Sequence, residues 1–253
     1  MEILERRQGS KVAALRVDLV EGSAARVSFT PPAGQRRGPS AYFDPYTGEL
    51  QGEVFGEGFF DLMLDLHRFL AMGGTGRQIT GACTLMLVFF CLSGLYLRWP
   101  RKALNWRTWL TLDWAKKGRA FNWDLHAVFG TWCLLFYLLA ALTGLTWSYQ
   151  WFGNAVNRML SDNGNVGLPA TVFYLRKDSP HDRAFGLLSL DPTTGQIKDI
   201  QRYEDKSLKA QLLTSIYALH VGSYFGLVGR ILMMLASLTM PLFLITGWLL
   251  YLD

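Results

Sequence analysis

The chain has 253 residues, of which 50% are hydrophobic and 18% are charged, with a formal net charge of +5. This composition is typical of a membrane protein with sizeable polar segments, and it argues against a soluble fold. Because the basic excess is modest and gathers in one short segment, we interpret it as a sign of membrane orientation rather than of nucleic-acid binding.

The polar N-terminal segment, residues 1–57, is predicted to form short strands. Strand-like patterns cover 11–19 and 25–30, and residues 41–43 and 49–54 flank an Asp-Pro-Tyr-Thr-Gly turn. Proline sets φ in such a turn and glycine takes the left-handed position, so the pattern predicts a β-hairpin. The polar segment that follows the second span carries a similar Asp-Pro-Thr-Thr-Gly turn. We expect two small antiparallel sheets.

Three stretches are long and apolar enough to cross a bilayer. Residues 79–97, 127–147 and 231–252 lack Asp, Glu, Lys and Arg and meet the length of about 20 residues that a spanning helix needs. The connection 98–119 carries seven basic residues and one acidic residue, which places it in the cytoplasm. The N-terminal segment is then outside, so we expect a further helix upstream of residue 1. The alternative is that insertion of the first span carries this segment across.

The chain repeats itself at a separation of 153 residues. Leu-His occurs before the first and the last span, with the histidines at His67 and His220. The same separation relates four further pairs: Gly76 and Gly229, Arg77 and Arg230, Ser93 and Thr246, and Gly94 and Gly247. A repeat of this length indicates a duplicated architectural unit. Both copies run from the outer face inwards, so they are parallel repeats about an axis along the membrane normal.

His67 and His220 are the first candidate site residues. Each lies in a short amphipathic segment at the outer face, ten residues before Arg77 or Arg230. Two equivalent histidines with two equivalent arginines are what a bis-imidazole haem site needs, because the arginines can neutralise propionates. A continuous helix would place each arginine about 15 Å from its histidine. The intervening glycines make a bend equally compatible.

His126 opens the middle span at its cytoplasmic end, about 25 Å of helix before Thr143. Zinc and a proton relay are alternative roles for the histidines, although the sequence offers neither a four-ligand cluster nor acidic partners in the spans. The fourth histidine, His181, lies in a polar loop and is predicted to be exposed. The cysteines lie inside the spans and are interpreted as packing residues: Cys83, Cys91 and Cys133.

The order of these motifs resembles the PepSY-associated transmembrane proteins, which include bacterial siderophore-iron reductases of the ferrioxamine-reductase type. The resemblance rests on the hairpins, on Leu-His, on Gly-Arg and on Leu-His-Ala-Val-Phe-Gly at 125–130. It implies a membrane α-helical bundle of four transmembrane helices, three of them visible here, with small periplasmic PepSY-like domains built on antiparallel sheets. It also implies haem b held by His67, His220 and His126: one haem in this chain, and two where a first helix supplies a partner for His126.

By this resemblance the chain divides into six segments. Residues 1–57 and 153–208 are periplasmic and PepSY-like; 58–98 and 209–253 each hold an amphipathic helix and a transmembrane helix; 99–121 is the basic cytoplasmic loop; 122–152 is a transmembrane helix.

The function implied by the resemblance is electron transfer across the bacterial inner membrane. A cytoplasmic donor would deliver electrons near His126, and a periplasmic ferric siderophore would accept them near His67 and His220. The sequence has no glycine motif for a nucleotide, so NAD(P)H or a flavin would sit on another protein. Two alternatives stay open: a membrane-anchored PepSY-type regulator or inhibitor of periplasmic peptidases, and a transporter subunit.

Overall fold

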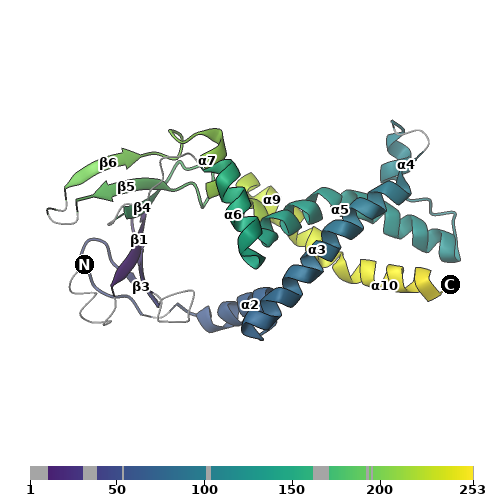
Figure 1. Ribbon diagram of the computed structural model, residues 1–253, viewed down its shortest axis with the longest axis horizontal. Coiled ribbons are helices and arrows are strands. Elements are labelled where there is room, and N and C mark those ends of the chain that lie inside the picture. Colours follow the sequence, from purple (N-terminus) through teal and green to yellow (C-terminus); the bar gives the residue numbers. More distant parts are fainter. Residues whose placement is uncertain are drawn as a thin grey trace. The chain divides into compact units, whose positions relative to one another are not determined.

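The computed structural model describes residues 11–30, 39–52, 54–100, 104–161, 171–191, 194 and 196–252. Residues 192, 193 and 195 of the second turn, and Arg101 and Lys102 of the basic segment, lie outside the described residues. The chain forms two compact units, each assembled from two separate stretches (Figure 1). The sheet unit comprises 1–63 and 157–215, and the helical unit comprises 64–156 and 216–253.

The sheet unit is built on one six-stranded sheet with the strand order β3-β2-β1-β4-β5-β6 (Figure 1). Its strands are β1 (Val12–Leu19), β2 (Ala25–Phe29), β3 (Ser40–Phe43), β4 (Thr171–Arg176), β5 (Gly186–Leu190) and β6 (Ile197–Gln201). β1, β2 and β3 lie where the sequence predicts strands, whereas the described residues of the predicted strand 49–54 form only an isolated bridge, between Leu50 and Phe43. The expectation of two separate antiparallel sheets is wrong. β1 and β4 pair in parallel, which joins both halves and leaves neither strand as an unpaired edge.

The two hairpin turns use the same hydrogen bonds. The backbone N–H of Asp44 donates to the Glu49 carbonyl over 2.9 Å, and that of Asp191 donates to the Gln196 carbonyl over 2.8 Å. In both copies the aspartate carboxylate accepts a hydrogen bond from the backbone N–H three residues later. These bonds tighten each turn from within, so the predicted repeat of the hairpin is confirmed among the described residues.

The sheet unit buries a polar side chain that the sequence places at the surface. His181 is 7% exposed. Its Nε2 lies 2.9 Å from Ser215 Oγ and 3.3 Å from the Tyr203 hydroxyl, and its Nδ1 accepts from the backbone N–H of Arg183 over 3.1 Å. The prediction of an exposed His181 is therefore wrong, because Tyr203 and Ser215, distant in the sequence, supply partners for Nε2, while the nearby backbone of Arg183 supplies one for Nδ1.

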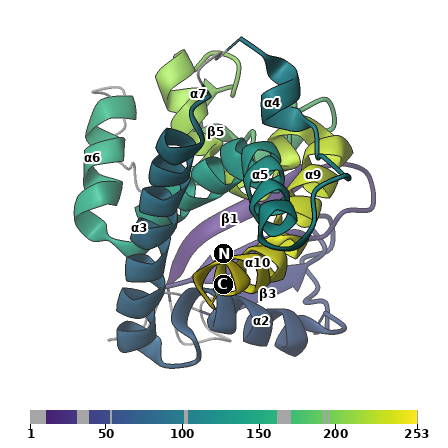
Figure 2. The same ribbon diagram turned by 90° about the vertical axis from the view of Figure 1, so that its right-hand side faces the viewer.

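The helical unit is arranged around α5 (Gly118–Ser148). The other helices are α3 (Gly73–Arg98), α4 (Trp106–Leu110), α8 (Ile216–His220), the 3₁₀ turn η1 (Ser223–Phe225), α9 (Gly226–Leu238) and α10 (Met240–Leu252). In Figure 2, α3 lies on one side of α5 and α9 on the other, and both pack against it. Two helices lead from one unit to the other, α2 (Glu57–Phe69) and α6 (Gln150–Leu160), while α7 (Leu208–Thr214) belongs to the sheet unit.

Within the described part of the chain, three helical stretches are long and apolar enough to cross a membrane: 73–98, 118–148 and 223–252. They contain the three predicted spans. The third is not one helix, because Thr239 separates α9 from α10 and the following Pro241 has no N–H to continue the helical bonding. Tyr137 of α5 donates to the Ala236 carbonyl over 2.7 Å. This hydrogen bond provides a partner for a backbone carbonyl next to the break between α9 and α10.

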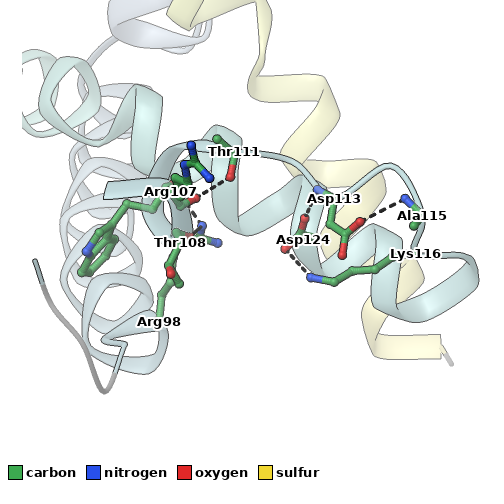
Figure 3. A network of polar contacts seen from close by, with 9 residues as sticks. Arg98, Arg107, Thr108, Thr111, Asp113, Ala115, Lys116 and Asp124 are labelled. Carbon is green, nitrogen blue, oxygen red and sulfur yellow. Dashed lines mark hydrogen bonds and ion pairs between the residues drawn. The ribbon is translucent and has the colours of Figure 1, made fainter. Parts of the chain in front are cut away.

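The basic segment between α3 and α5 folds around two charged side chains (Figure 3). Arg98 donates to carbonyls near the end of α4 over 2.7 and 3.0 Å. Asp124 accepts from the backbone N–H of Asp113 over 2.8 Å and from Lys116 Nζ over 2.9 Å. These bonds fix the segment immediately before His126.

Candidate functional site

His67 and His220 each lie just before a sharp bend of the chain. His67 is near the end of α2, and His220 is the last residue of α8. After His67, Leu70 and Ala71 have φ values of 50° and 54°, and after His220, Gly222 has a φ value of 78°. These left-handed residues end each helix, so the chain bends between each histidine and its arginine.

One close backbone contact shapes both bends. A Cβ at Gly76 would lie 1.6 Å from the Phe69 carbonyl oxygen, and a Cβ at Gly229 would lie 2.2 Å from the Gly222 carbonyl oxygen. Phe69 and Gly222 are themselves 153 residues apart. Only glycine permits such an approach of two backbone segments. The repeat in the sequence is therefore also a repeat of backbone geometry.

The fold brings His67 and His220 together. Their ring centres are 6.1 Å apart and the ring planes are inclined by 54°. A metal–imidazole bond is about 2 Å and the ring centre lies about 1 Å beyond the nitrogen, so two imidazoles on opposite sides of one metal ion have centres roughly 6 Å apart. The spacing of the pair is compatible with both rings binding one metal ion.

His220 is held from α5. Its Nδ1 lies 2.9 Å from Thr143 Oγ1 and 3.1 Å from the Ala140 carbonyl oxygen, and the Trp147 ring packs edge-on against it with centres 5.3 Å apart. Burial lowers the pKa of His220, the nearby His67 lowers this pKa further, and the Ala140 carbonyl opposes them. The net direction favours the neutral imidazole, which is the form that binds metals.

His67 has different surroundings. Its side chain is exposed, and among the described residues it makes no hydrogen bond and faces the ring of His220. The arginines also differ. Arg77 has a buried Nε that finds no partner within the described ranges, whereas Arg230 is exposed. Gly76 packs against the carbonyl of Phe69, so the bend brings Arg77 to the end of the helix that carries His67.

His126 belongs to a separate site at the other end of α5. Its Nδ1 lies 2.8 Å from Thr246 Oγ1 of α10, and the Phe243 ring packs edge-on against it with centres 5.2 Å apart. Seventeen residues of α5 separate His126 from Thr143, which corresponds to about 25 Å along the helix. The structure therefore does not bring His126 to the His67–His220 pair.

Thr143 and Thr246 are site residues to which the sequence analysis assigns no role. Each is followed by a glycine against which the histidine ring lies. A Cβ at Gly144 would be 3.4 Å from His220 Cε1, and a Cβ at Gly247 would be 3.7 Å from His126 Cε1. The signal that could have revealed them is the recurrence of Thr-Gly near the end of two spans.

The remaining metal-binding side chains are dispersed. No group of three or more His, Cys, Asp or Glu that could hold a metal ion occurs in the ranges the structure describes. The cysteines are all free; Cys91 and Cys133 are buried and Cys83 is exposed. The His67–His220 pair thus offers two imidazoles, which suits a group that brings its remaining ligands with it, as haem does.

These features define a membrane protein in which three bilayer-length helical stretches accompany a separate unit with a mixed sheet. The family model for the PepSY-associated TM region matches residues 3–253, and the chain belongs to this family. It is also similar to the uncharacterized protein PA4219 of Pseudomonas aeruginosa, with 36% identity over 87 residues, which are 33% of this chain and 20% of that protein. The match spans about a fifth of that relative's length.

Proposed function

We propose that this protein binds haem b between His67 and His220 and carries electrons across the bacterial inner membrane to a periplasmic ferric siderophore. The observation that carries this proposal is the pair itself, with ring centres 6.1 Å apart and contributed by equivalent positions of a duplicated unit. When bound between two imidazoles, haem supplies one-electron exchange between Fe(III) and Fe(II).

Two features around the pair support haem as the ligand: the Nε2 side of His220, free among the described residues, and the nearby arginines. His220 uses its Nδ1 for hydrogen bonds to α5, so its Nε2 remains for iron. Arg77 has a buried Nε without a partner among the described residues. Such an atom costs free energy unless a ligand satisfies it, and a propionate would do so by a charge-assisted hydrogen bond. Arg230, the equivalent residue, is exposed, and we assign it to the second propionate.

His126 marks the side at which electrons would enter. The basic segment that the positive-inside rule assigns to the cytoplasm is fixed directly before it by Asp124. We infer that an unidentified cytoplasmic donor docks at this end, with any NAD(P)H or flavin bound to the donor. A second haem at His126 would take a further ligand from outside the described residues.

The reaction is a one-electron reduction for each ferric ion. The donor loses one electron and the chelated Fe(III) becomes Fe(II). The hard oxygen ligands of a hydroxamate siderophore hold Fe(II) less tightly, so the metal is released. No bond within the siderophore needs to break.

The experiment uses the full chain, purified in detergent after expression with a haem supply. The expected protein is coloured, with a Soret band and split α and β bands on reduction. After reduction with a stoichiometric amount of dithionite, ferrioxamine B is added in the presence of ferrozine. The α band should be lost as one ferrozine-bound Fe(II) appears for each haem oxidised. The gallium(III) complex of the same chelator is the matched control, because it has the same ligand and accepts no electron, and it should leave the reduced spectrum unchanged.

Two results would overturn the proposal. One is a folded, monodisperse protein that takes up no haem, which would leave the PepSY-type regulator of peptidases as the better candidate. The other is a haem protein whose reduced spectrum persists in ferrioxamine B. Orientation is tested separately by reporter fusions. A periplasmic reporter should be active at residue 60 and inactive at residue 110, and the reverse pattern would contradict the proposed direction of transfer.

A further inference from the structure

We propose that Thr143 and Thr246 are positioning residues that fix His220 and His126 in the tautomer with the proton on Nδ1. Each histidine then presents the lone pair of Nε2 to a ligand. The tautomers follow from the hydrogen bonds of the protein alone. The use of Nε2 to bind iron rests on the proposed function.

The hydrogen bonds of Thr246 place a proton on Nδ1 of His126. Thr246 Oγ1 lies 2.8 Å from the Leu242 carbonyl oxygen, to which it donates, and 2.8 Å from His126 Nδ1. A hydroxyl has one proton to donate, and a carbonyl oxygen can only accept. If Thr246 gives its proton to Leu242, the contact with His126 is a hydrogen bond only when Nδ1 carries a proton. The other tautomer would leave one of these two short contacts without a hydrogen.

His220 makes the same kind of contact with Thr143 and has a second acceptor beside its Nδ1. Thr143 Oγ1 donates to the Leu139 carbonyl oxygen over 2.6 Å and lies 2.9 Å from His220 Nδ1. The same Nδ1 is 3.1 Å from the carbonyl oxygen of Ala140. This carbonyl has no proton to offer, so Nδ1 must supply it. Two acceptors therefore fix His220, whereas among the described residues one acceptor fixes His126.

The glycine after each threonine completes the arrangement. Gly144 and Gly247 lie against Cε1, the ring carbon between the two nitrogens. A Cβ at either position would be in ordinary van der Waals contact with the ring, 3.4 Å from it at Gly144 and 3.7 Å from it at Gly247. The dipeptide Thr-Gly thus orients the imidazole by a hydrogen bond and gives the ring room beside the helix.

His181 provides an opposite case within the same chain. Its Nδ1 accepts a hydrogen bond from the backbone N–H of Arg183, so the proton of the neutral ring must be on Nε2. Ser215 Oγ donates to the Gln211 carbonyl oxygen and lies 2.9 Å from Nε2, which is the accepting geometry this tautomer requires. One protein therefore contains both neutral tautomers, and His181 is an internal reference.

The test is nitrogen NMR of the full chain labelled with ¹⁵N-histidine, recorded at a pH where all four rings are neutral. Protonated and unprotonated ring nitrogens have well-separated shifts, and single His→Asn variants assign them. The full chain is prepared without haem, because iron on Nε2 would by itself exclude a proton from that nitrogen. We expect the proton on Nδ1 in His126 and His220 and on Nε2 in His181.

Threonine variants test the cause. Thr246→Val keeps the β-branched shape but removes the acceptor, and it should shift the tautomer ratio of His126 by about fivefold to tenfold towards Nε2–H, the effect of one hydrogen bond. Thr143→Val should change the ratio of His220 by less than about threefold, because the Ala140 carbonyl remains. Thr246→Ser and Thr143→Ser restore the hydroxyl and should restore the wild-type ratios. A merely structural threonine would not give this pattern.

The outcomes separate the inference from the proposed function. The predicted tautomers in a protein that takes up no haem when haem is supplied would support the inference and contradict the function. Haem uptake by the supplied protein, together with an unchanged His126 tautomer in haem-free Thr246→Val, would contradict the inference and leave the function intact. Nε2–H on His126 or His220 in the wild-type protein would overturn the inference directly.

Discussion

The two copies of the repeat share a backbone and differ in what surrounds it. In both, a glycine packs against a carbonyl and turns the chain after a histidine. In the second copy, hydrogen bonds from α5 hold His220 at Nδ1. In the first copy His67 is exposed and, among the described residues, has no hydrogen bond. The bend therefore places both histidines, whereas the orientation of each ring depends on the helix next to it.

The Ser/Thr-Gly pairs show the same contrast. Thr246 and Gly247 hold His126. Ser93 and Gly94 occupy the equivalent positions of α3, and no atom of the described chain lies within 4 Å of a Cβ built at Gly94. Duplication thus supplied equivalent residues, but among the described residues the contact with a histidine forms at Thr246 and Gly247 and not at Ser93 and Gly94.

The largest expected effect is on the bends themselves. Gly76→Ala and Gly229→Ala each push a methyl group into a backbone carbonyl that cannot move without opening the turn. We expect each to lower the free energy of unfolding by about 3 kcal/mol or more, measured by denaturation of the purified protein in detergent. Gly94→Ala is the matched control, because its methyl group enters open space, and it should be neutral or slightly stabilising. Equal losses at all three glycines would contradict the shared geometry of the bends.

The second prediction compares the two histidines as ligands. His220→Ala removes the ring that α5 holds in place, and it should lower haem content about tenfold or more. His67→Ala leaves His220 oriented, so part of the pigment should remain with one axial imidazole and a high-spin spectrum. His181→Ala, a histidine variant in the sheet unit, should keep the wild-type spectrum. Equal haem contents in His67→Ala and His220→Ala would refute the expected difference between the two histidines.

Third, the arginines should differ in the same direction. Arg77→Gln removes a cation whose Nε is buried without a partner in the described chain, so we expect a several-fold higher dissociation constant for haem. Arg230→Gln changes an exposed cation and should have a smaller effect, since solvent weakens such pairs. Haem titrations of the two variants provide the measurement, and a larger loss from Arg230→Gln would reverse the assignment.

The smallest expected effect concerns pH and the sheet unit. Burial lowers the pKa of His181 from its ordinary value of 6.5, and the neighbouring Asp182 partly offsets this shift. The neutral ring is thus favoured in the fold, so its contribution to stability is complete above pH 6.5 and is lost as the pH falls through 6.5 towards the lower native pKa. The protection factors for hydrogen exchange of residues 203–215, which correct for the intrinsic pH dependence of exchange, should therefore fall on acidification. This fall should be weaker in His181→Gln, and an identical pH dependence of the protection factors in the two proteins would contradict the prediction.

Much of the fold follows from local sequence patterns, because apolar length defines the spans and Asp-Pro-x-Thr-Gly defines the hairpins. The parallel pairing of β1 with β4 does not, since it joins strands more than 150 residues apart and leaves no local pattern. The approach of His67 to His220 was anticipated from the repeat. The partners of His181 and the roles of Thr143 and Thr246 depend on contacts between distant segments, which a single sequence does not specify.

The central claim is that His67 and His220 hold one haem between them. The most direct measurement is the electron paramagnetic resonance spectrum of the oxidised full chain, beside that of a folded His67→Ala/His220→Ala double variant. The account predicts a low-spin bis-imidazole signal in the wild-type protein that is absent from the double variant. The same low-spin signal in the double variant, or a folded wild-type protein that binds no haem, would contradict it.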